Sequence, residues 1–212
     1  PWIWGTTAAS AIAAVLLAGG TGAWAVARAD SGAQVAFDSS RNDDRMIDRD
    51  HLTAFSWLAS RPEAREGLVL GESTEGYSWM YAIHGVPTVS RHYLWPSGGI
   101  GSNSIMLVDH AALLGTGEHG KPGADNPIDA AAKNIDVRFI ISSGNTFWNT
   151  PVNWQVHKAL WTSPGVTPVY QRHNVTIFAV NSQFSTAELK ALQRDAVAKG
   201  GSSTLPELEP IQ

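Results

Sequence analysis

The 212-residue sequence contains no cysteine, which excludes disulfides, thiolate metal sites and a cysteine nucleophile. Charged residues are also scarce, at 16% of the chain against about 25% in typical globular proteins. The formal net charge of -4 gives no basis for general affinity toward nucleic acid or anionic lipid. Hydrophobic residues make up 43% of the chain, which is enough to form a buried core.

The motifs of the common metal and phosphate sites are missing as well. The seven histidines are scattered without an HExxH or another close pair, so we expect no metal site and no cofactor. The turn over 72–76 follows a strand pattern, but it lacks the lysine and the glycine spacing of a P-loop. The Gly-x-Ser-x-Gly elbow of many hydrolases is also absent, which leaves a soluble hydrolase as a distant alternative.

Residues 1–27 contain no Asp, Glu, Lys, Arg or His. At about 1.5 Å of rise per residue, this run is long enough to cross a bilayer core of about 30 Å. We therefore predict a transmembrane helix over 1–27, in contact with the lipid bilayer and flanked by an aromatic belt. The chain begins with Pro1, so we expect this helix to be the last span of a longer protein. A signal peptide with a loose cleavage site at 27–29, or a buried core helix, is the alternative.

The remainder of the chain has the composition of one domain with a connector and a tail. A polar connector over 28–47 leads into a domain over 48–198, and a polar, proline-containing tail follows over 199–212, which we expect to be disordered. Predicted helices over 48–60 and 126–133 have apolar faces suited to packing on a sheet.

Short apolar runs predict the strands of that sheet. The run over 137–142 is β-branched and apolar, as in a buried central strand. The other strands are predicted at 67–71, 167–172 and 175–181, with a further edge candidate at 86–90. The last two main strands should form an antiparallel hairpin. The fold class predicted from this pattern is α/β: a small mixed sheet with helices packed on it, preceded by one transmembrane helix.

Candidate binding residues lie behind the first strand and in the loop after residue 90. Ligands of α/β sheets bind at the carboxyl ends of the strands, and Glu75 and Tyr77 follow such an end. The loop adds a cation, a titratable ring and two stacking faces, which are Arg91, His92, Tyr93 and Trp95. Aromatic faces with polar neighbours suit sugars, so we predict that these six residues meet at an exposed cleft that binds a neutral or acidic sugar.

Each of these assignments has a structural alternative. Glu75, with Ser73 or Thr74, could cap the helix that follows. The aromatic residues of the loop could fold onto the core, with Arg91 paired to a surface carboxylate.

Four segments in this order carry a resemblance to a known class of proteins: a helix ending Trp57-Leu58-Ala59, then 71–82, 135–141 and 168–180. The order resembles the C-terminal extracytoplasmic domains of large polytopic membrane proteins of actinobacteria. Their general plan is similar to that of envelope glycosyltransferases of the GT-C class, which use lipid-linked sugar donors.

The resemblance implies a domain outside the cytoplasm, at the cell membrane, that assists glycan or acceptor binding in envelope assembly. Its expected partners are cell-wall glycan or lipid-linked sugar, and no nucleic acid. In that class the catalytic carboxylate usually lies in an early extracytoplasmic loop, upstream of this segment. No catalytic residue is therefore assigned here, and whether the protein is an enzyme stays open. The alternative is a non-catalytic envelope scaffold or protein-interaction module.

Overall fold

The structure is a computed structural model that describes residues 47–92, 101–117, 126–143 and 155–202, together with the backbone of 151–154. The chain divides into two units between Arg45 and Met46, and all the elements described below belong to the second. The transmembrane helix predicted over 1–27 lies outside the described residues, as do nearly all of the connector and most of the tail. Among the helices of the described part, none is long and apolar enough to span a membrane.

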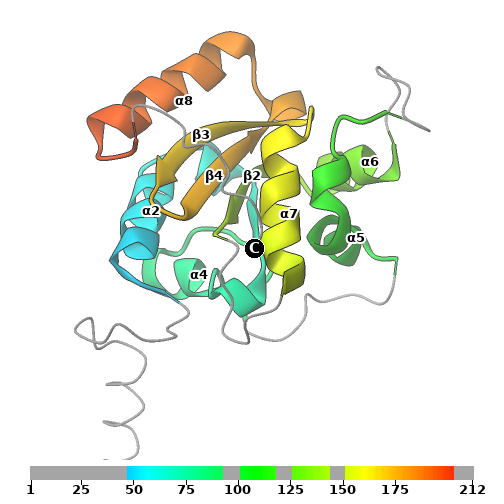
Figure 1. The fold of residues 1–212 in the computed structure, drawn as a ribbon, viewed down its shortest axis with the longest axis horizontal. Coiled ribbons are helices and arrows are strands. Elements are labelled where there is room, and N and C mark those ends of the chain that lie inside the picture. Colours follow the sequence, from blue (N-terminus) through cyan, green and yellow to red (C-terminus); the bar gives the residue numbers. More distant parts are fainter. Residues whose placement is uncertain (1–46, 93–100, 118–125, 144–150, 203–212) are drawn as a thin grey trace, which may run out of the picture. The chain divides into compact units, whose positions relative to one another are not determined.

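Four strands form one mixed sheet at the centre of this unit (Figure 1). They are β1 (Leu68–Gly71), β2 (Val137–Ser142), β3 (Val166–Arg172) and β4 (Val175–Val180). The strand order is β1-β2-β4-β3, with β1 and β2 parallel and the two other pairs antiparallel. The predicted sheet, its inner position for β2 and the closing hairpin are thereby confirmed.

The segment 86–90, predicted as an edge strand, lies beside β1 but forms no extended strand. This segment makes only one parallel bridge to β1, between Val69 and Thr88. Pro87 lacks the N–H that a longer ladder would need.

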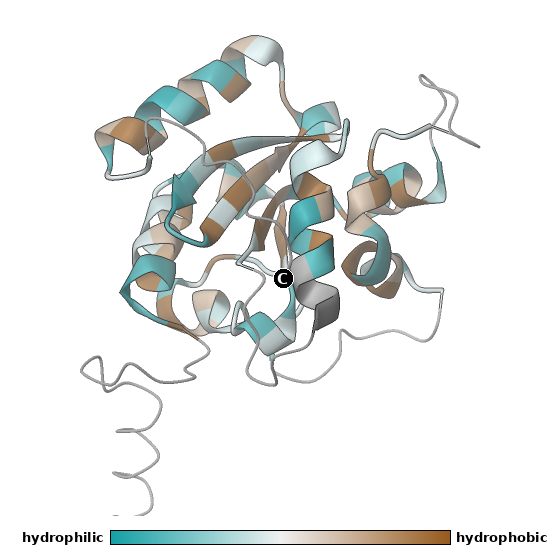
Figure 2. Cartoon of the chain, viewed as in Figure 1, coloured by the Kyte–Doolittle hydropathy of each residue, from teal (hydrophilic) through white to brown (hydrophobic). Residues whose placement is uncertain are grey.

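Helices cover both faces of the sheet (Figure 1). Their bounds, with the short 3₁₀ turns marked η, are α2 (Arg49–Ala59), α3 (Glu63–Glu66), η1 (Ser73–Glu75), α4 (Trp79–His84), α5 (Asn103–His110), η2 (Ala111–Leu113), α6 (Pro127–Asn134), α7 (Pro151–Thr162), η3 (Asn181–Gln183) and α8 (Thr186–Ala198). One apolar cluster joins α2, α4 and α8 to one face, and a second joins α5, α6 and α7 to the other. In Figure 2 the strands are largely hydrophobic, whereas α8 alternates hydrophobic and hydrophilic residues along its length.

Local capping explains where several of these helices begin. The Asp48 carboxylate accepts hydrogen bonds from the first backbone N–H groups of α2, and Asn126 and Ser185 do the same for α6 and α8. Such caps satisfy N–H groups that have no partner inside the helix. The sequence signals for these starts are therefore strong, because each depends on residues within one turn of the helix.

Strand β2 places successive side chains on opposite faces. Phe139 and Ile141 belong to the cluster with α2, whereas Ile140 belongs to the cluster with α7. The same alternation continues beyond the apolar residues, so Ser142 faces α7 and Ser143 faces α2. These two serines organise the site at the carboxyl end of the strand.

Candidate functional site

A cavity of about 490 Å³ opens at the carboxyl ends of β1 and β2. Because these two strands are parallel, both ends lie at the same edge of the sheet, where ligands of α/β folds bind. Residues of η1, α5 and α7 complete the lining. The volume lies within the range of about 300–1,000 Å³ that is usual for small-molecule sites.

The lining combines an apolar part with a polar part. Aliphatic side chains from the strands and from α5 and α7 form the apolar part, for example Leu70, Ile140 and Leu160. The polar members are Glu72, Thr74, Glu75, Asp109, His110 and Ser142. Three of these are carboxylic acids, and no Lys or Arg belongs to the described lining. Such a cavity disfavours phosphate and other anions and favours a neutral ligand that carries hydroxyl groups.

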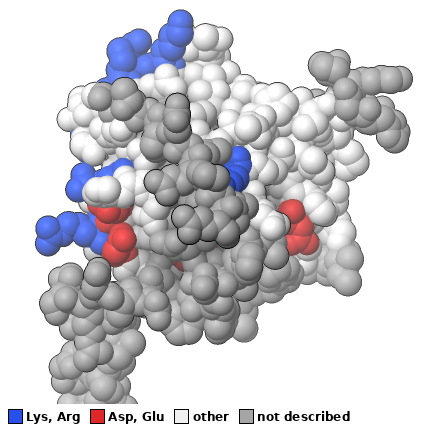
Figure 3. All heavy atoms as spheres, in the orientation of Figure 1, with Lys and Arg blue, Asp and Glu red and all other residues white. Residues whose placement is uncertain are grey.

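The distribution of surface charge agrees with this. In Figure 3, Lys and Arg atoms lie at the top of the view, over α8, at its left edge and at one place near the centre. The right-hand part of the same face, where α5 and α6 lie, shows acidic atoms and no basic ones. Within the described part of the chain, no group of His, Asp and Glu side chains could hold a metal ion.

Glu75 is the most enclosed carboxylate of the cavity, at 2% exposure. Its Oε2 accepts a hydrogen bond from the Ser143 backbone N–H at 3.1 Å, which ties η1 to the end of β2. Capping of the following helix, which the sequence offered as the alternative role of Glu75, is not observed, because the N-cap of α4 is Ser78 and has no side-chain hydrogen bond. Glu72 caps η1 instead, since Glu72 Oε1 accepts from the Thr74 N–H at 3.0 Å. The Glu75 side chain is thereby held at the cavity.

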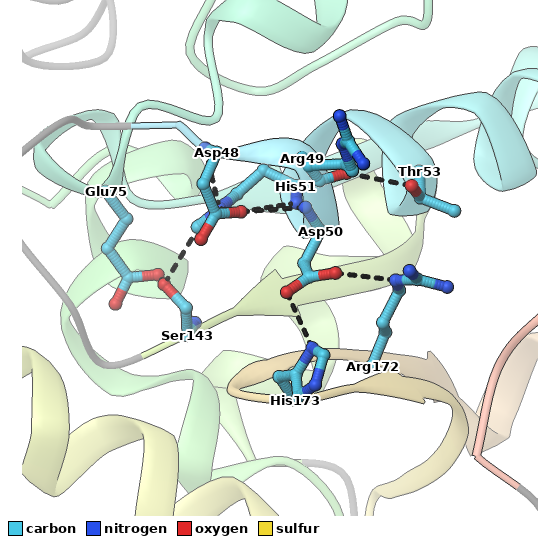
Figure 4. A network of polar contacts seen from close by, with 9 residues as sticks. All are labelled: Asp48, Arg49, Asp50, His51, Thr53, Glu75, Ser143, Arg172 and His173. Carbon is cyan, nitrogen blue, oxygen red and sulfur yellow. Dashed lines mark hydrogen bonds and ion pairs between the residues drawn. The ribbon is translucent and has the colours of Figure 1, made fainter. Parts of the chain in front are cut away.

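Behind Glu75, a chain of polar contacts leads to the start of α2 (Figure 4). The His51 Nε2 atom lies 3.4 Å from Ser143 Oγ, and His51 Nδ1 lies 2.8 Å from Asp48 Oδ1. Nδ1 is also 3.3 Å from the Asp48 backbone nitrogen, but the shorter contact with a carboxylate decides that Nδ1 carries the proton. The hydrogen bond with His51 lowers the pKa of Asp48 well below its ordinary value. The carboxylate is therefore ionised at neutral pH.

The order Ser143–His51–Asp48 has the connectivity of a nucleophile, a base and an orienting acid. A catalytic triad needs a nucleophile that the substrate can reach and an acid that is shielded from solvent, but here the exposures of the two residues are reversed. Ser143 is 0% exposed and does not line the cavity, whereas the Asp48 side chain is 55% exposed. This arrangement supports Glu75 and anchors α2 rather than presenting a nucleophile to a substrate.

Asp50, next to this chain of contacts, makes a separate ionic contact (Figure 4). Its two carboxylate oxygens lie 2.6 Å from Arg172 Nε and 2.6 Å from His173 Nδ1. The contact joins α2 to the turn between β3 and β4 and takes no part in the cavity.

On the opposite face of the sheet, Ser142 contacts a second buried histidine. His157 Nδ1 lies 3.1 Å from Ser142 Oγ, and the Trp161 indole N–H donates to His157 Nε2 at 3.3 Å. Burial lowers the pKa of His157 to about 4, so the ring is neutral at pH 7. Two buried histidines, His51 and His157, therefore contact the serines at the end of β2 from opposite faces of the sheet.

Of the four predicted binding residues that the structure describes, only Glu75 lines the cavity. Glu75 lines the cavity, but Tyr77 lies in the core at 1% exposure, because its ring packs directly on Gly71 and within 5.7 Å of His51. Burial raises the pKa of Tyr77 well above its ordinary value. The expectation of an exposed Tyr77 is corrected accordingly.

Arg91 and His92 are exposed and lie outside the cavity lining. The Arg91 guanidinium is 5.3 Å from the centre of the Tyr81 ring, a cation–π contact in place of the expected position at the cleft. Tyr93 and Trp95, the remaining two residues, lie outside the described residues.

Sequence reasoning missed the residues of the cavity wall opposite Glu75. Asp109 and His110 close α5 without any recognisable motif. The pair His157 and Trp161 carried only one sequence signal, which is that a separation by four residues on a helix lets two side chains meet.

Comparison with known proteins adds a family. Among solved structures, the C-terminal globular domain of an oligosaccharyltransferase from Archaeoglobus fulgidus matches with a TM-score of 0.38 and 13% sequence identity, covering 64% of this chain and 99% of that chain. A likeness at this level carries no argument about function. No curated protein matches the chain. The model of a family of unknown function, DUF6541, matches residues 2–182, and the chain therefore belongs to that family.

Proposed function

We propose that this domain binds a neutral glycan segment in the cavity at the ends of β1 and β2. The supporting observation is the lining itself, which combines three carboxylates with aliphatic side chains and contains no Lys or Arg among the described residues. Carboxylates accept hydrogen bonds from hydroxyl groups, and aliphatic surface covers the C–H faces of a sugar ring. An acidic sugar, which the sequence left open, would meet repulsion from Glu72, Glu75 and Asp109.

The setting that we propose for this activity is the cell envelope. The uncharged run over 1–27 supports attachment of the domain to a membrane. In this proposal the domain stands outside the cytoplasm and assists a glycosyltransferase-like protein by holding glycan or acceptor. The chemistry of sugar transfer is assigned to no residue of this chain.

The test is calorimetric titration of the full 212-residue chain in mild detergent with neutral arabinan, galactan and mannan oligosaccharides. We expect saturable binding of one of them, and Glu75→Gln should weaken it about tenfold or more. The physical reason is that a hydrogen bond to a charged acceptor contributes roughly 1.5–3 kcal/mol, and Gln keeps the shape of the side chain but not its charge.

Glu66→Gln is the matched control. Glu66 is an exposed carboxylate that pairs with Arg138 at 2.9 Å, away from the cavity lining. Its replacement should leave the affinity unchanged. Failure of all three oligosaccharides to bind would contradict the proposal and would favour the scaffold alternative. Equal weakening by both variants would show that the cavity is not the site.

A further inference from the structure

Ser142 and Ser143 are adjacent serines whose hydroxyl groups contact different histidines. The two contacts differ in which atom donates the hydrogen bond. Each hydroxyl has one hydrogen to donate and can also accept. Each hydroxyl contacts a histidine ring, His157 for Ser142 and His51 for Ser143, and the Ser143 side chain also interacts with the buried Tyr77 hydroxyl. Which atom donates in each pair therefore decides which hydroxyl hydrogen is available to a ligand.

The tautomer of His157 follows from Trp161. An indole N–H can only donate, so His157 Nε2 must be the acceptor of the 3.3 Å contact. The lowered pKa keeps the ring neutral at pH 7, so its one proton is on Nδ1. Nδ1 then donates to Ser142 Oγ at 3.1 Å. The Ser142 hydroxyl accepts this bond and keeps its own hydrogen.

The tautomer of His51 gives Ser143 the opposite role. The ionised Asp48 accepts a hydrogen bond from the His51 Nδ1–H at 2.8 Å, and in the neutral ring Nε2 is then the acceptor. The Ser143 hydroxyl donates to that nitrogen over 3.4 Å. Its hydrogen is thus used inside the protein, and Ser143 does not belong to the cavity lining.

We infer that Ser142 is a hydrogen-bond donor of the cavity toward an acceptor oxygen of the ligand, and that His157 and Trp161 are positioning residues that orient it. Ser142 lines the cavity together with Glu72 and Glu75, which can only accept when ionised. The ligand must then present an acceptor oxygen near hydroxyl donors. A glycan does so, with its ring or glycosidic oxygen between hydroxyl groups. This inference rests on the proposed function. It adds the direction of one hydrogen bond, from the Ser142 hydroxyl to an oxygen of the ligand.

One test needs no ligand. Long-range ¹H–¹⁵N spectra of the full chain at pH 7 report which nitrogen of each histidine carries the proton. We expect His157 to be the Nδ1–H tautomer, and Trp161→Phe, which removes the indole N–H, should shift the ring toward a mixture of tautomers. An Nε2–H tautomer in the unaltered protein would overturn the inference.

The second test uses the oligosaccharide that binds most tightly among the neutral arabinan, galactan and mannan fragments. Ser142→Ala should weaken its binding about fivefold, as expected for the loss of one neutral hydrogen bond, and Ser142→Thr should restore most of the affinity. Ser143→Ala keeps the backbone N–H that holds Glu75, so its effect should be clearly smaller. Ser56→Ala, on the exposed side of α2, should have none.

Deoxy and deoxyfluoro versions of the same oligosaccharide identify the atom that Ser142 contacts. Fluorine is a weak hydrogen-bond acceptor and cannot donate. At the ligand position that faces Ser142, replacing the hydroxyl by fluorine should therefore weaken binding less than replacing it by hydrogen. This difference should disappear in Ser142→Ala. If Ser142 donates to a ring or glycosidic oxygen of the ligand, no hydroxyl position will show this difference between fluorine and hydrogen. The comparison of the affinities of Ser142→Ala and Ser142→Thr then tests the inference.

The outcomes separate this inference from the proposed function. Absence of binding by every oligosaccharide would contradict the proposed function. Binding that Glu75→Gln weakens but Ser142→Ala leaves unchanged would overturn the inference alone. His157→Gln should make Ser142→Ala less costly than in the unaltered protein, because a positioning residue and the group it positions are not additive. Additive effects would show that His157 serves only the core.

Discussion

Replacing Trp57 by alanine should lower the free energy of unfolding by about 3–5 kcal/mol, the usual cost of removing a large buried ring. The Trp57 ring stacks on Tyr170 at 5.1 Å and meets the edge of Phe139 at 6.4 Å. Its indole N–H donates to Asp195 Oδ2 at 2.9 Å, and the Arg61 guanidinium lies 5.8 Å from its centre. One side chain therefore joins α2, β2, β3 and α8. Urea unfolding of the full chain in mild detergent measures the change.

Two variants calibrate this prediction. Trp57→Phe keeps a stacked ring but loses the hydrogen bond to Asp195, so it should cost about 1–2 kcal/mol. Leu52→Ala, on the same helix but 41% exposed, should change stability by no more than about 0.5 kcal/mol. A loss below about 1 kcal/mol for Trp57→Ala would contradict the packing described here.

Acidification should destabilise the domain through His157. Its pKa is about 4 in the folded protein and 6.5 as the ordinary value, because burial disfavours the charged ring. Above pH 6.5 the ring is neutral in both states, and its contribution to stability is fully present. As the pH falls from 6.5 toward 4, the unfolded chain takes up a proton that the folded chain does not. Stability should fall by about 1.4 kcal/mol per pH unit and by about 3 kcal/mol in total.

Unfolding curves measured between pH 7 and pH 3 test this effect. His157→Gln should flatten the dependence between pH 6.5 and 4, although the variant starts from a lower stability because its bond with Trp161 changes. Asp48→Asn is the matched control. The pKa of Asp48 is lowered in the folded protein, so its contribution is present above about pH 4 and is lost below that value. An unchanged slope in His157→Gln would show that another group governs the acid range.

The amino-acid sequence by itself determined the local elements. The apolar run of β2, the hairpin of β3 and β4 and the caps Asp48, Asn126 and Ser185 each depend on residues a few positions apart. Their periodicity and capping chemistry act within single elements, so they predict strands and helices without knowledge of the rest of the chain. The α/β class followed from the order of these elements.

The tertiary structure alone decided which polar groups meet. Ser143 and His51 are separated by 92 positions in the sequence, and Ser143 and Glu75 by 68, so no local pattern connects them. Tyr77 has an amphipathic side chain that suits a core or a cleft, and packing on Gly71 decided for the core. The opposite roles of the Ser142 and Ser143 hydroxyls arise for a similar reason, because the pleat of β2 places them on different faces of the sheet. The histidine that packs on each face determines which serine hydroxyl can donate a hydrogen bond to a ligand.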